Sequence, residues 1–440
     1  AWGTRVGRGG AISCGMVETG NDSRGGLYAI VGDAAFLACS WTWCIGMYLP
    51  AVLLRDYGIW SFVAFALPNC IGAAAMAWWI GDSERSRQFV VTHAWAIRVF
   101  SYVTIAFQWF FAAWLLRNLG FSVWTLGAIA AGVATYLTVP VRLLDDKPRR
   151  IVSVLVWCVS VALLATWAIM NQDQATTANL PRPLLDARTW TGHTGSHVAP
   201  LAAVCLLGFS LCPLLDVTFH MTVQRSKAPR ATFALGFLVM FIVMILGTLL
   251  YGAQLVRDGA ASAVSIAPAG VAWLVVFHMA VQLAFTLASH ERGVTQEVAG
   301  LDRAPTRGVS MAVPVATVIG VVLALIATMA GPLPAWQPPP PKGDAALPGL
   351  TNMEFIYRGF MTFYAVAVPL YVLGCAAPWR GRRAGWSLHR GMILGAGLLG
   401  AMPLYYLGFV ARRSENLWYG VGVVMVFGAV AACVPGGKRA

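Results

Sequence analysis

Twelve stretches of the sequence, each near 20 residues long, mainly apolar and bounded by charges, constrain the fold more than any other feature. A helix needs about 20 apolar residues to cross a membrane. Lipid offers the backbone no hydrogen-bond partner, and no stretch alternates apolar and polar residues as a membrane barrel strand does, so each is predicted to be a helix. The sequence thus predicts an all-α integral membrane protein of about twelve transmembrane helices. The predicted spans are residues 27–53, 59–80, 89–115, 121–141, 151–171, 199–220, 231–254, 266–289, 310–331, 353–377, 386–410 and 415–434.

Charge and composition indicate the compartment. Of the 440 residues, 58% are apolar and 11% are charged, against about 25% charged in soluble domains, which excludes a soluble enzyme. The net charge is +13, and 21 of the 31 Lys and Arg residues lie on the alternate connections that include both termini, against eight on the others. Because basic residues concentrate in cytoplasmic loops, we expect a multi-pass protein of the cell (inner or plasma) membrane with both termini cytoplasmic. Its basic loops are expected to contact anionic lipid and not nucleic acid.

Two predicted spans contain small, polar and helix-weakening residues about midway. The first span reads SWTWCIGMYLP over residues 40–50, and the sixth reads GFSLCP over residues 208–213. Unwound backbone at the membrane midplane is tolerated only where it lines a cavity or ligand, so such breaks indicate the binding site of a transporter. The two spans are five apart and cross the membrane in opposite directions. The alternative is that Gly and Pro, which are enriched in membrane helices, only kink them.

With these two breaks, the chain resembles the LeuT-like fold of secondary transporters, the amino acid-polyamine-organocation and sodium-solute symporter superfamily. The resemblance is architectural and implies twelve helices, cytoplasmic termini, broken first and sixth helices, and a five-plus-five inverted repeat with two extra C-terminal helices. The implied domains are a cytoplasmic tail at 1–26, a first repeat at 27–171, an external loop at 172–198, a second repeat at 199–378, two further helices at 379–434 and a cytoplasmic tail at 435–440.

The resemblance also implies that both breaks contact the substrate. Trp41 and Trp43 lie deep in the first span, where their ring faces would wall an amphipathic or cationic substrate. Core packing is the commoner role of such residues. The implied substrate-binding residues are Ser40, Trp41, Thr42, Trp43 and Gly46 in the first break and Gly208, Phe209 and Ser210 in the second.

Arg98 lies some ten residues into the third predicted span, near the membrane midplane. A charge at this depth is costly unless it is paired or hydrated, which makes it a functional candidate. Its guanidinium suits a bidentate clamp on a substrate carboxylate, or else an internal ion pair between helices. Asp33 and Asp216, in the inner halves of the two broken spans, are each a candidate partner of Arg98 or a carrier of a proton or cation.

Two histidines extend the set of coupling candidates, which becomes Asp33, Asp216, His220 and His278. His220 follows Asp216 by four residues, so the two are expected to share a helical face. His278 lies in the middle of the eighth span, where sodium-coupled members of the resembled group carry Ser or Thr. A proton is therefore at least as good a candidate as sodium, because histidine changes charge near neutral pH.

Glu354 and Arg358 lie four residues apart at the outer end of the tenth span, and Arg55 lies just beyond the outer end of the first. One interpretation is an external gate made of ion pairs. The alternative is a solvated salt bridge at a helix end, of a kind that contributes little to stability.

The sequence favours a secondary active transporter that moves a small polar or zwitterionic, amino-acid-like solute by alternating access, with proton or sodium coupling. It contains no ATP-binding or dinucleotide-binding motif, and no cofactor or metal site is predicted. One alternative is a polytopic membrane enzyme resembling the membrane-bound O-acyltransferases, with a catalytic His278. Another is a six-plus-six facilitator, indicated by the charged loop predicted at Glu84 to Arg87.

Overall fold

The chain folds into a bundle of membrane-crossing helices. The computed structural model describes residues 22–118, 146–170, 198–258, 272–298, 306–329, 350–376 and 386–435, and it contains no β-strand within these ranges. In this part of the chain, ten helices are long and apolar enough to cross a membrane, and a bent pair makes an eleventh span. The predicted all-α, multi-pass membrane fold is confirmed. The predicted span at 121–141 lies outside the described residues, as do residues 1–21 of the tail predicted at 1–26, residues 436–440 of the tail predicted at 435–440, and all but the last residue of the external loop predicted at 172–198.

The helices of the first half follow the predicted spans closely. The first predicted span is two helices, the second and fifth are continuous, and the third is interrupted at His93, whose ψ is 22°. Their bounds are α1 Asp22–Trp41, α2 Cys44–Tyr57, α3 Ile59–Ile80, α4 Ser83–Asn118 and α6 Asp146–Met170.

The second half contains more interruptions, several of them short π-helical turns. Each predicted span from the sixth to the twelfth nevertheless has its counterpart. The elements are α9 Val198–Leu211, η2 Cys212–Leu215, α10 Val217–Arg225, α11 Pro229–Leu235, η3 Gly236–Met240, α12 Phe241–Asp258, α13 Ala272–Arg292, η4 Gly293–Val298, α15 Thr306–Met329, α16 Asn352–Thr362, η6 Phe363–Ala367, α17 Val368–Tyr371, η7 Val372–Ala376, α18 Leu388–Tyr405, η9 Tyr406–Val410 and α19 Asn416–Cys433.

The first span breaks where the sequence predicts it. Helix α1 ends at Trp41, α2 begins at Cys44, and the two axes differ in direction by 53°. Trp43 is extended, with ψ 176°. The Thr42 hydroxyl donates to the Ala38 carbonyl at 2.7 Å, and such back-bonding by Ser or Thr competes with the helical backbone.

The second break lies a few residues later than predicted. Residues 208–211 are still helical, and the chain leaves the α-helix in the 3-10 turn Cys212–Leu215 and at Asp216, which is extended with ψ 116°. Pro213 explains the position, because its ring lacks an N–H and disturbs the turn around it. The carboxylate of Asp216 then accepts from Thr218 N and caps α10.

Two helix ends differ from the predicted spans, with functional consequences. Helix α4 begins at Ser83, so Glu84 and Arg87 belong to its first turns and not to a loop. The charged loop that indicated a six-plus-six facilitator is therefore a helix start. Helix α13 continues to Arg292, beyond the predicted end at 289, and it carries His290 into the helix.

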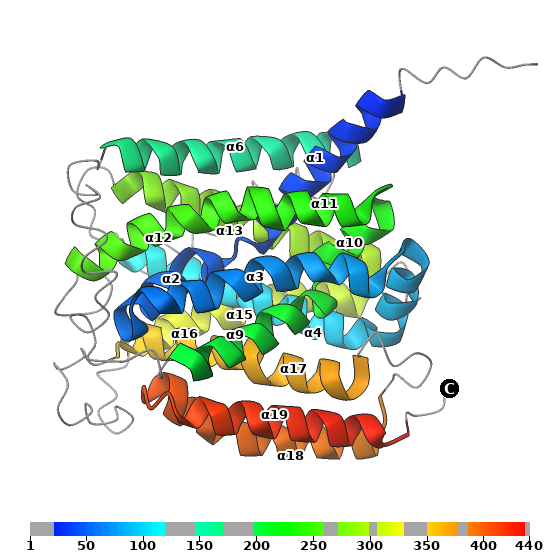
Figure 1. Cartoon of the computed structure of the whole chain (residues 1–440), viewed down its shortest axis with the longest axis vertical. Coiled ribbons are helices and arrows are strands. Elements are labelled where there is room, and N and C mark those ends of the chain that lie inside the picture. The colour runs from blue at the N-terminus through cyan, green and yellow to red at the C-terminus, as the bar shows by residue number, and fades with distance from the viewer. Residues whose placement is uncertain are drawn as a thin grey trace, which may run out of the picture.

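Two helix pairings join the first half of the chain to the second. Helix α3, the second span, packs along α9 of the sixth, and α12 of the seventh packs along α2 of the first. Exchanging spans 1–5 with spans 6–10 turns one of these pairs into the other, which is compatible with the inverted repeat expected from the sequence. Helices α18 and α19 form an outer pair at one edge, and the start of α1 and the end of α19 lie at the same end of the bundle (Figure 1).

The contact between α3 and α9 depends on Gly72. A Cβ atom at this position would lie 2.9 Å from the Phe209 carbonyl oxygen and 2.9 Å from Ser210 Cα. Small residues at helix crossings let membrane helices approach in this way.

We predict that Gly72→Ala destabilises the folded chain by about 1–3 kcal/mol, because backbone atoms must move to admit the methyl group. The measurement is the midpoint of thermal unfolding of the full chain in detergent. Gly422→Ala in α19 is the matched control, because a Cβ there meets nothing within 4 Å. Equal midpoints for the two variants would show that the α3–α9 contact tolerates a side chain.

Candidate functional site

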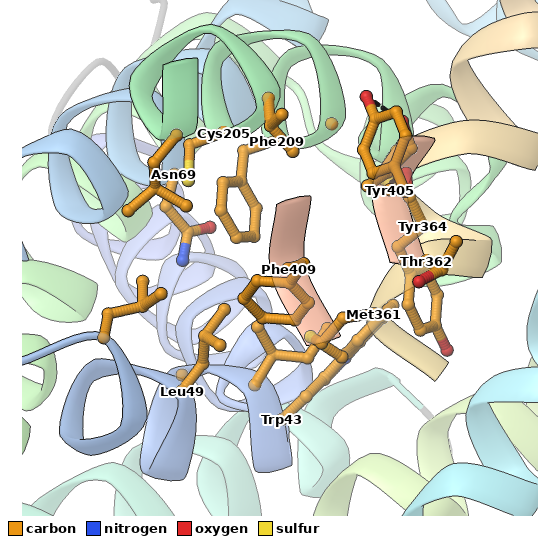
Figure 2. A pocket seen from close by; sticks show the side chains of 18 of the residues that line it. Trp43, Leu49, Asn69, Cys205, Phe209, Met361, Thr362, Tyr364, Tyr405 and Phe409 are labelled. Carbon is orange, nitrogen blue, oxygen red and sulfur yellow. Dashed lines mark hydrogen bonds between the residues drawn. The ribbon is translucent and has the colours of Figure 1, made fainter. Parts of the chain in front are cut away.

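A cavity of about 70 Å³ lies beside the two breaks, between α2, α3, α9, α16 with η6, and the outer ends of α18 and α19. In Figure 2, Asn69 and Phe209 lie on one side of the cavity and Tyr364 and Tyr405 on the other. Most of its wall is apolar or aromatic. The lining residues are Trp41, Trp43, Ile45, Gly46, Leu49, Leu53, Asn69, Leu201, Val204, Cys205, Gly208, Phe209, Cys212, Met361, Thr362, Tyr364, Ala365, Tyr405, Phe409 and Leu417.

The indoles of Trp41 and Trp43 form the wall at the first break. Their ring centroids are 4.8 Å apart, and both side chains are at most 5% exposed. Trp43 also contacts the rings of Phe100 on α4, His290 on α13 and Tyr364 on η6, with centroids 5.4–5.5 Å away. This single residue therefore touches four separate segments of the bundle.

Asn69 and Thr362 supply polar groups to the wall, while the hydroxyls of the lining residues Tyr364 and Tyr405 lie within hydrogen-bond distance of Thr104 Oγ1 and the Ala365 carbonyl. Asn69 Oδ1 accepts from Trp41 Nε1 at 2.6 Å, which leaves its Nδ2 amide as a donor for a ligand. The Thr362 hydroxyl donates to the Arg358 carbonyl at 3.1 Å, so its oxygen can still accept. Among the described residues, no charged side chain lines the cavity. Such a site suits an uncharged molecule with a flat body.

The structure brings five of the predicted substrate-binding residues to this wall, namely Trp41, Trp43, Gly46, Gly208 and Phe209.

The other predicted residues of the breaks contact protein. The Ser40 hydroxyl is 3.1 Å from Thr218 Oγ1 and so joins the end of α1 to the start of α10. The Thr42 hydroxyl points back to its own helix and toward Met244 of α12. Ser210 packs against α3 at Gly72. These side chains hold the broken helices in place.

Arg98 lies outside the cavity lining, on a half-buried part of α4. The neighbouring positions Ile97 and Phe100 are fully buried. Sequence position gave the depth of Arg98 in the membrane but not its direction around the helix, and only the direction decides whether it meets a solute.

The predicted gate residues form a buried ion network at the end of the bundle where α2 finishes, which we call the outer end in line with the predicted topology. Glu354 accepts from Arg55 Nη1 at 3.0 Å and from Arg358 Nε at 3.0 Å. Asp56 accepts from Arg55 Nε at 3.0 Å and from Arg358 Nη2. Each of these four residues is at most 9% exposed.

This network differs from the solvated salt bridge considered from the sequence, because four charges from α2 and α16 are buried together. It also lies directly against the cavity. The Arg358 guanidinium lies over the Phe409 ring at 4.7 Å and donates to the Phe409 carbonyl, and Phe409 lines the cavity. Phe409 therefore lies between the network and the cavity.

Asp33 is engaged in an ion pair toward the inner end. Its two carboxylate oxygens each accept from Arg150 at 2.9 Å, and Arg149 Nη2 lies 3.4 Å from Oδ1. Gly32 allows this approach of α6 to α1, because a Cβ there would lie 2.5 Å from Arg150 Cβ. The partners of Asp33 are thus on α6, whereas Arg98 was one of the two alternatives considered from the sequence.

The two predicted histidines occupy different surroundings. His220 Nδ1 is 2.9 Å from the Ser86 hydroxyl, and Nε2 is 3.0 Å from the Leu214 carbonyl, so the His220 side chain does not pair with that of Asp216. His278 is fully buried on α13 and does not line the cavity. Neither of its ring nitrogens has a hydrogen-bond partner among the described residues.

The residue that faces Asp216 is His290, which sequence reasoning missed. Its Nε2 lies 3.7 Å from Asp216 Oδ2. His290 lies one residue beyond the predicted end of the eighth span, so the prediction leaves it in the connection that follows. The helix extends to Arg292 and therefore includes His290 in the bundle.

We predict that Glu354→Gln opens the outer end of the site. Removing one charge from a buried pair costs about 3–5 kcal/mol, so the cavity-lining Cys205 should be alkylated by a membrane-impermeant maleimide roughly tenfold faster or more. The assay uses protein in which the other cysteines are replaced by alanine. Glu415→Gln, an exposed position near the same end, is the control. Unchanged alkylation of Cys205 in Glu354→Gln would argue against a closing role for the network.

A scan against models of known protein families found no match, and neither did a search of curated proteins. Among solved structures, the chain is similar to Mhp1, a nucleobase-cation-symport-1 family transporter in a closed conformation with bromovinylhydantoin bound, at 14% identity over 91% of each chain with a TM-score of 0.46. It is also similar to the Eremococcus coleocola manganese transporter in complex with an aromatic bis-isothiourea substituted compound, at 12% identity over 94% of this chain and 97% of that chain with a TM-score of 0.49. These likenesses assign neither family nor substrate.

Proposed function

We propose that this chain is a secondary active transporter that moves a small, uncharged organic solute across the cell membrane by alternating access. The observation that carries the proposal is the cavity beside both helix breaks, which is walled by aromatic rings and adjoins a buried ion network through Phe409. Unwound membrane backbone beside a cavity is the arrangement found at transporter binding sites.

The solute class follows from the lining. Burying an unpaired charge is very costly, and within the described chain the wall offers no side chain of opposite charge. The aromatic rings favour a flat, largely apolar body, and Asn69 Nδ2 favours a carbonyl oxygen on it. The proposed solute class is therefore narrower than the polar or zwitterionic class expected from the sequence, because it leaves out zwitterions. That expectation relied on Arg98 as a carboxylate clamp.

The solute must be small or must expand the site. A cavity of about 70 Å³ is smaller than the roughly 150 Å³ that holds benzene in an engineered protein cavity. Binding of a molecule as large as benzene or larger would therefore have to widen this cavity. Alternating access would rock the first, second, sixth and seventh spans against the third, fourth, eighth and ninth, with the breaks as hinges and with a proton as the preferred coupling ion.

The rival functions fit the structure less well. An acyltransferase would need His278 at a site open to its substrates, but His278 is fully buried and lies away from the cavity. A six-plus-six facilitator would lack the crosswise pairing of α3 with α9 and of α2 with α12.

The function is tested by uptake into proteoliposomes containing the full chain. A panel of matched pairs, each an uncharged heteroaromatic carbonyl compound and its amino-acid or carboxylate counterpart, is first screened by thermal shift. We expect the uncharged members to stabilise the protein and to accumulate under an imposed ion gradient. Binding restricted to the charged members would overturn the proposed solute class. If no compound that binds is taken up under an ion gradient, the proposed transport function is overturned.

We predict that Trp43→Leu weakens binding of the best uncharged ligand by roughly three- to tenfold, because the variant loses an aromatic contact of about 0.5–1.5 kcal/mol. The dissociation constant is measured by titration in detergent. Trp418→Leu serves as the control, because Trp418 is 49% exposed on α19 and does not line the cavity. Equal losses in the two variants would place the ligand elsewhere.

A further inference from the structure

Asp216 and His290 form an acid–base pair at the second break that no role described above explains. Asp216 Oδ2 and His290 Nε2 lie 3.7 Å apart, and both residues are 0% exposed. Neither atom has a hydrogen-bond partner in the described part of the chain. Leaving a buried polar atom unsatisfied costs about 1–3 kcal/mol, so two such atoms that face each other need an explanation.

The remaining polar atoms of the pair are satisfied. Asp216 Oδ1 accepts from both the backbone N–H and the hydroxyl of Thr218, each at 2.7 Å. His290 Nδ1 lies 3.3 Å from the Ser101 hydroxyl of α4. These contacts hold the carboxylate and the imidazole so that only Oδ2 and Nε2 remain available, and the space between them accommodates one proton.

We propose that Asp216 and His290 together bind the proton that drives solute transport, an inference that rests on the proposed function. One proton enters from the aqueous side when the site is open to it, binds between Oδ2 and Nε2, and leaves to the opposite side after the conformational change. No other bond forms or breaks, and one positive charge crosses the membrane with each uncharged solute.

Other titratable groups on the surrounding elements are committed elsewhere. His220 on α10 bonds to Ser86 and Leu214, and His93 on α4 lies 2.8 Å from the Tyr371 hydroxyl. Asp33 on α1 is paired with Arg149 and Arg150 of α6, and Arg292 follows on the last turn of α13.

The neighbouring thiols and phenol also have partners or lack a link to the pair. The Cys212 thiol on η2 donates to the Tyr364 carbonyl, and the Tyr364 hydroxyl is 3.0 Å from Thr104 Oγ1. Cys39 on α1 donates to the Ser153 carbonyl. Cys44 on α2 lies across the first break. Asp216 and His290 are thus the facing acid–base pair at the junction of the breaks.

The pair is linked to the cavity through Trp43. The Trp43 ring packs against the His290 ring with centroids 5.4 Å apart, and Trp43 Nε1 donates to the Ser40 carbonyl at 2.5 Å. The Ser40 hydroxyl meets Thr218 Oγ1 at 3.1 Å, and Thr218 in turn bonds to Asp216. A solute stacked on Trp43 therefore acts on both members of the pair.

The geometry also explains how a proton would change the conformation. Hydrogen bonds form at about 2.7–3.2 Å, so a shared proton would draw Asp216 Oδ2 and His290 Nε2 together from 3.7 Å. Asp216 leads α10 of the sixth span, and His290 lies on α13 of the eighth. These spans belong to the two groups that rock against each other, so binding the proton tightens the contact between them.

The test uses His290→Gln and Asp216→Asn, with His389→Gln at an exposed position of α18 as control. In proteoliposomes, a proton gradient should drive solute accumulation by the original protein and by His389→Gln. In Asp216→Asn and His290→Gln, the accumulation ratio should fall at least roughly tenfold. Both variants should still exchange solute across the membrane. Accumulation by His290→Gln equal to that of the original protein would overturn the proposal.

A second measurement is independent of transport. Infrared difference spectra of the full chain in nanodiscs, recorded over a pH series, should contain a carboxylic acid band that is absent from Asp216→Asn. In His290→Gln, the pH at which this band reaches half its intensity should shift. A midpoint unchanged by His290→Gln would also overturn the proton site. If no solute is transported by any protein, the proposed function fails, while these spectra still decide whether the pair binds a proton.

Discussion

The break in the first span imposes the strongest physical demand on this fold, because backbone carbonyls freed from a membrane helix must find donors inside the protein. At the break itself, Trp43 supplies two of these donors, its N–H to the Trp41 carbonyl at 2.8 Å and its Nε1 to the Ser40 carbonyl at 2.5 Å. Helices α12, α13 and α16 of three other spans are tied to carbonyls on either side of the break. The hydroxyls of Thr286, Tyr357 and Tyr251 reach the carbonyls of Cys39, Cys44 and Met47 at 3.4, 3.0 and 2.5 Å.

Charges are separated from the cavity that this arrangement leaves. Ion pairs lie at the two ends, with Arg55 and Glu354 at the outer end and Asp33 and Arg150 toward the inner end. A charge at an end can exchange its partner for water when that end opens, whereas a charge in the closed cavity could not. An aromatic cavity between charged ends is thus compatible with opening on either side.

Much of the fold could be predicted from the sequence because lipid imposes it. Apolar runs gave the spans, and the polar residues around Thr42 gave the first break. The second break was displaced because Pro213 disturbs the turn around it and the chain resumes a helix only after Asp216. His290 was missed because the helix continues past the last residue of the apolar run. The direction in which Arg98 points from α4 depends on tertiary packing, which the spacing of residues does not encode.

The two ends of the bundle are not closed equally firmly. At the outer end, Arg55, Asp56, Glu354 and Arg358 are all at most 9% exposed, so opening there separates several buried charges at a cost of about 3–5 kcal/mol for each broken pair. At the inner end, Asp33 is held by Arg149, whose side chain is 1% exposed, and by Arg150, whose side chain is 16% exposed. There are thus fewer buried charges to separate, and water can replace part of the Arg150 pairing as the helices part. The neutral bond between Ser40 and Thr218 contributes only about 0.5–1.5 kcal/mol. From this conformation, movement of the inner halves of the broken helices therefore costs less than disruption of the outer network.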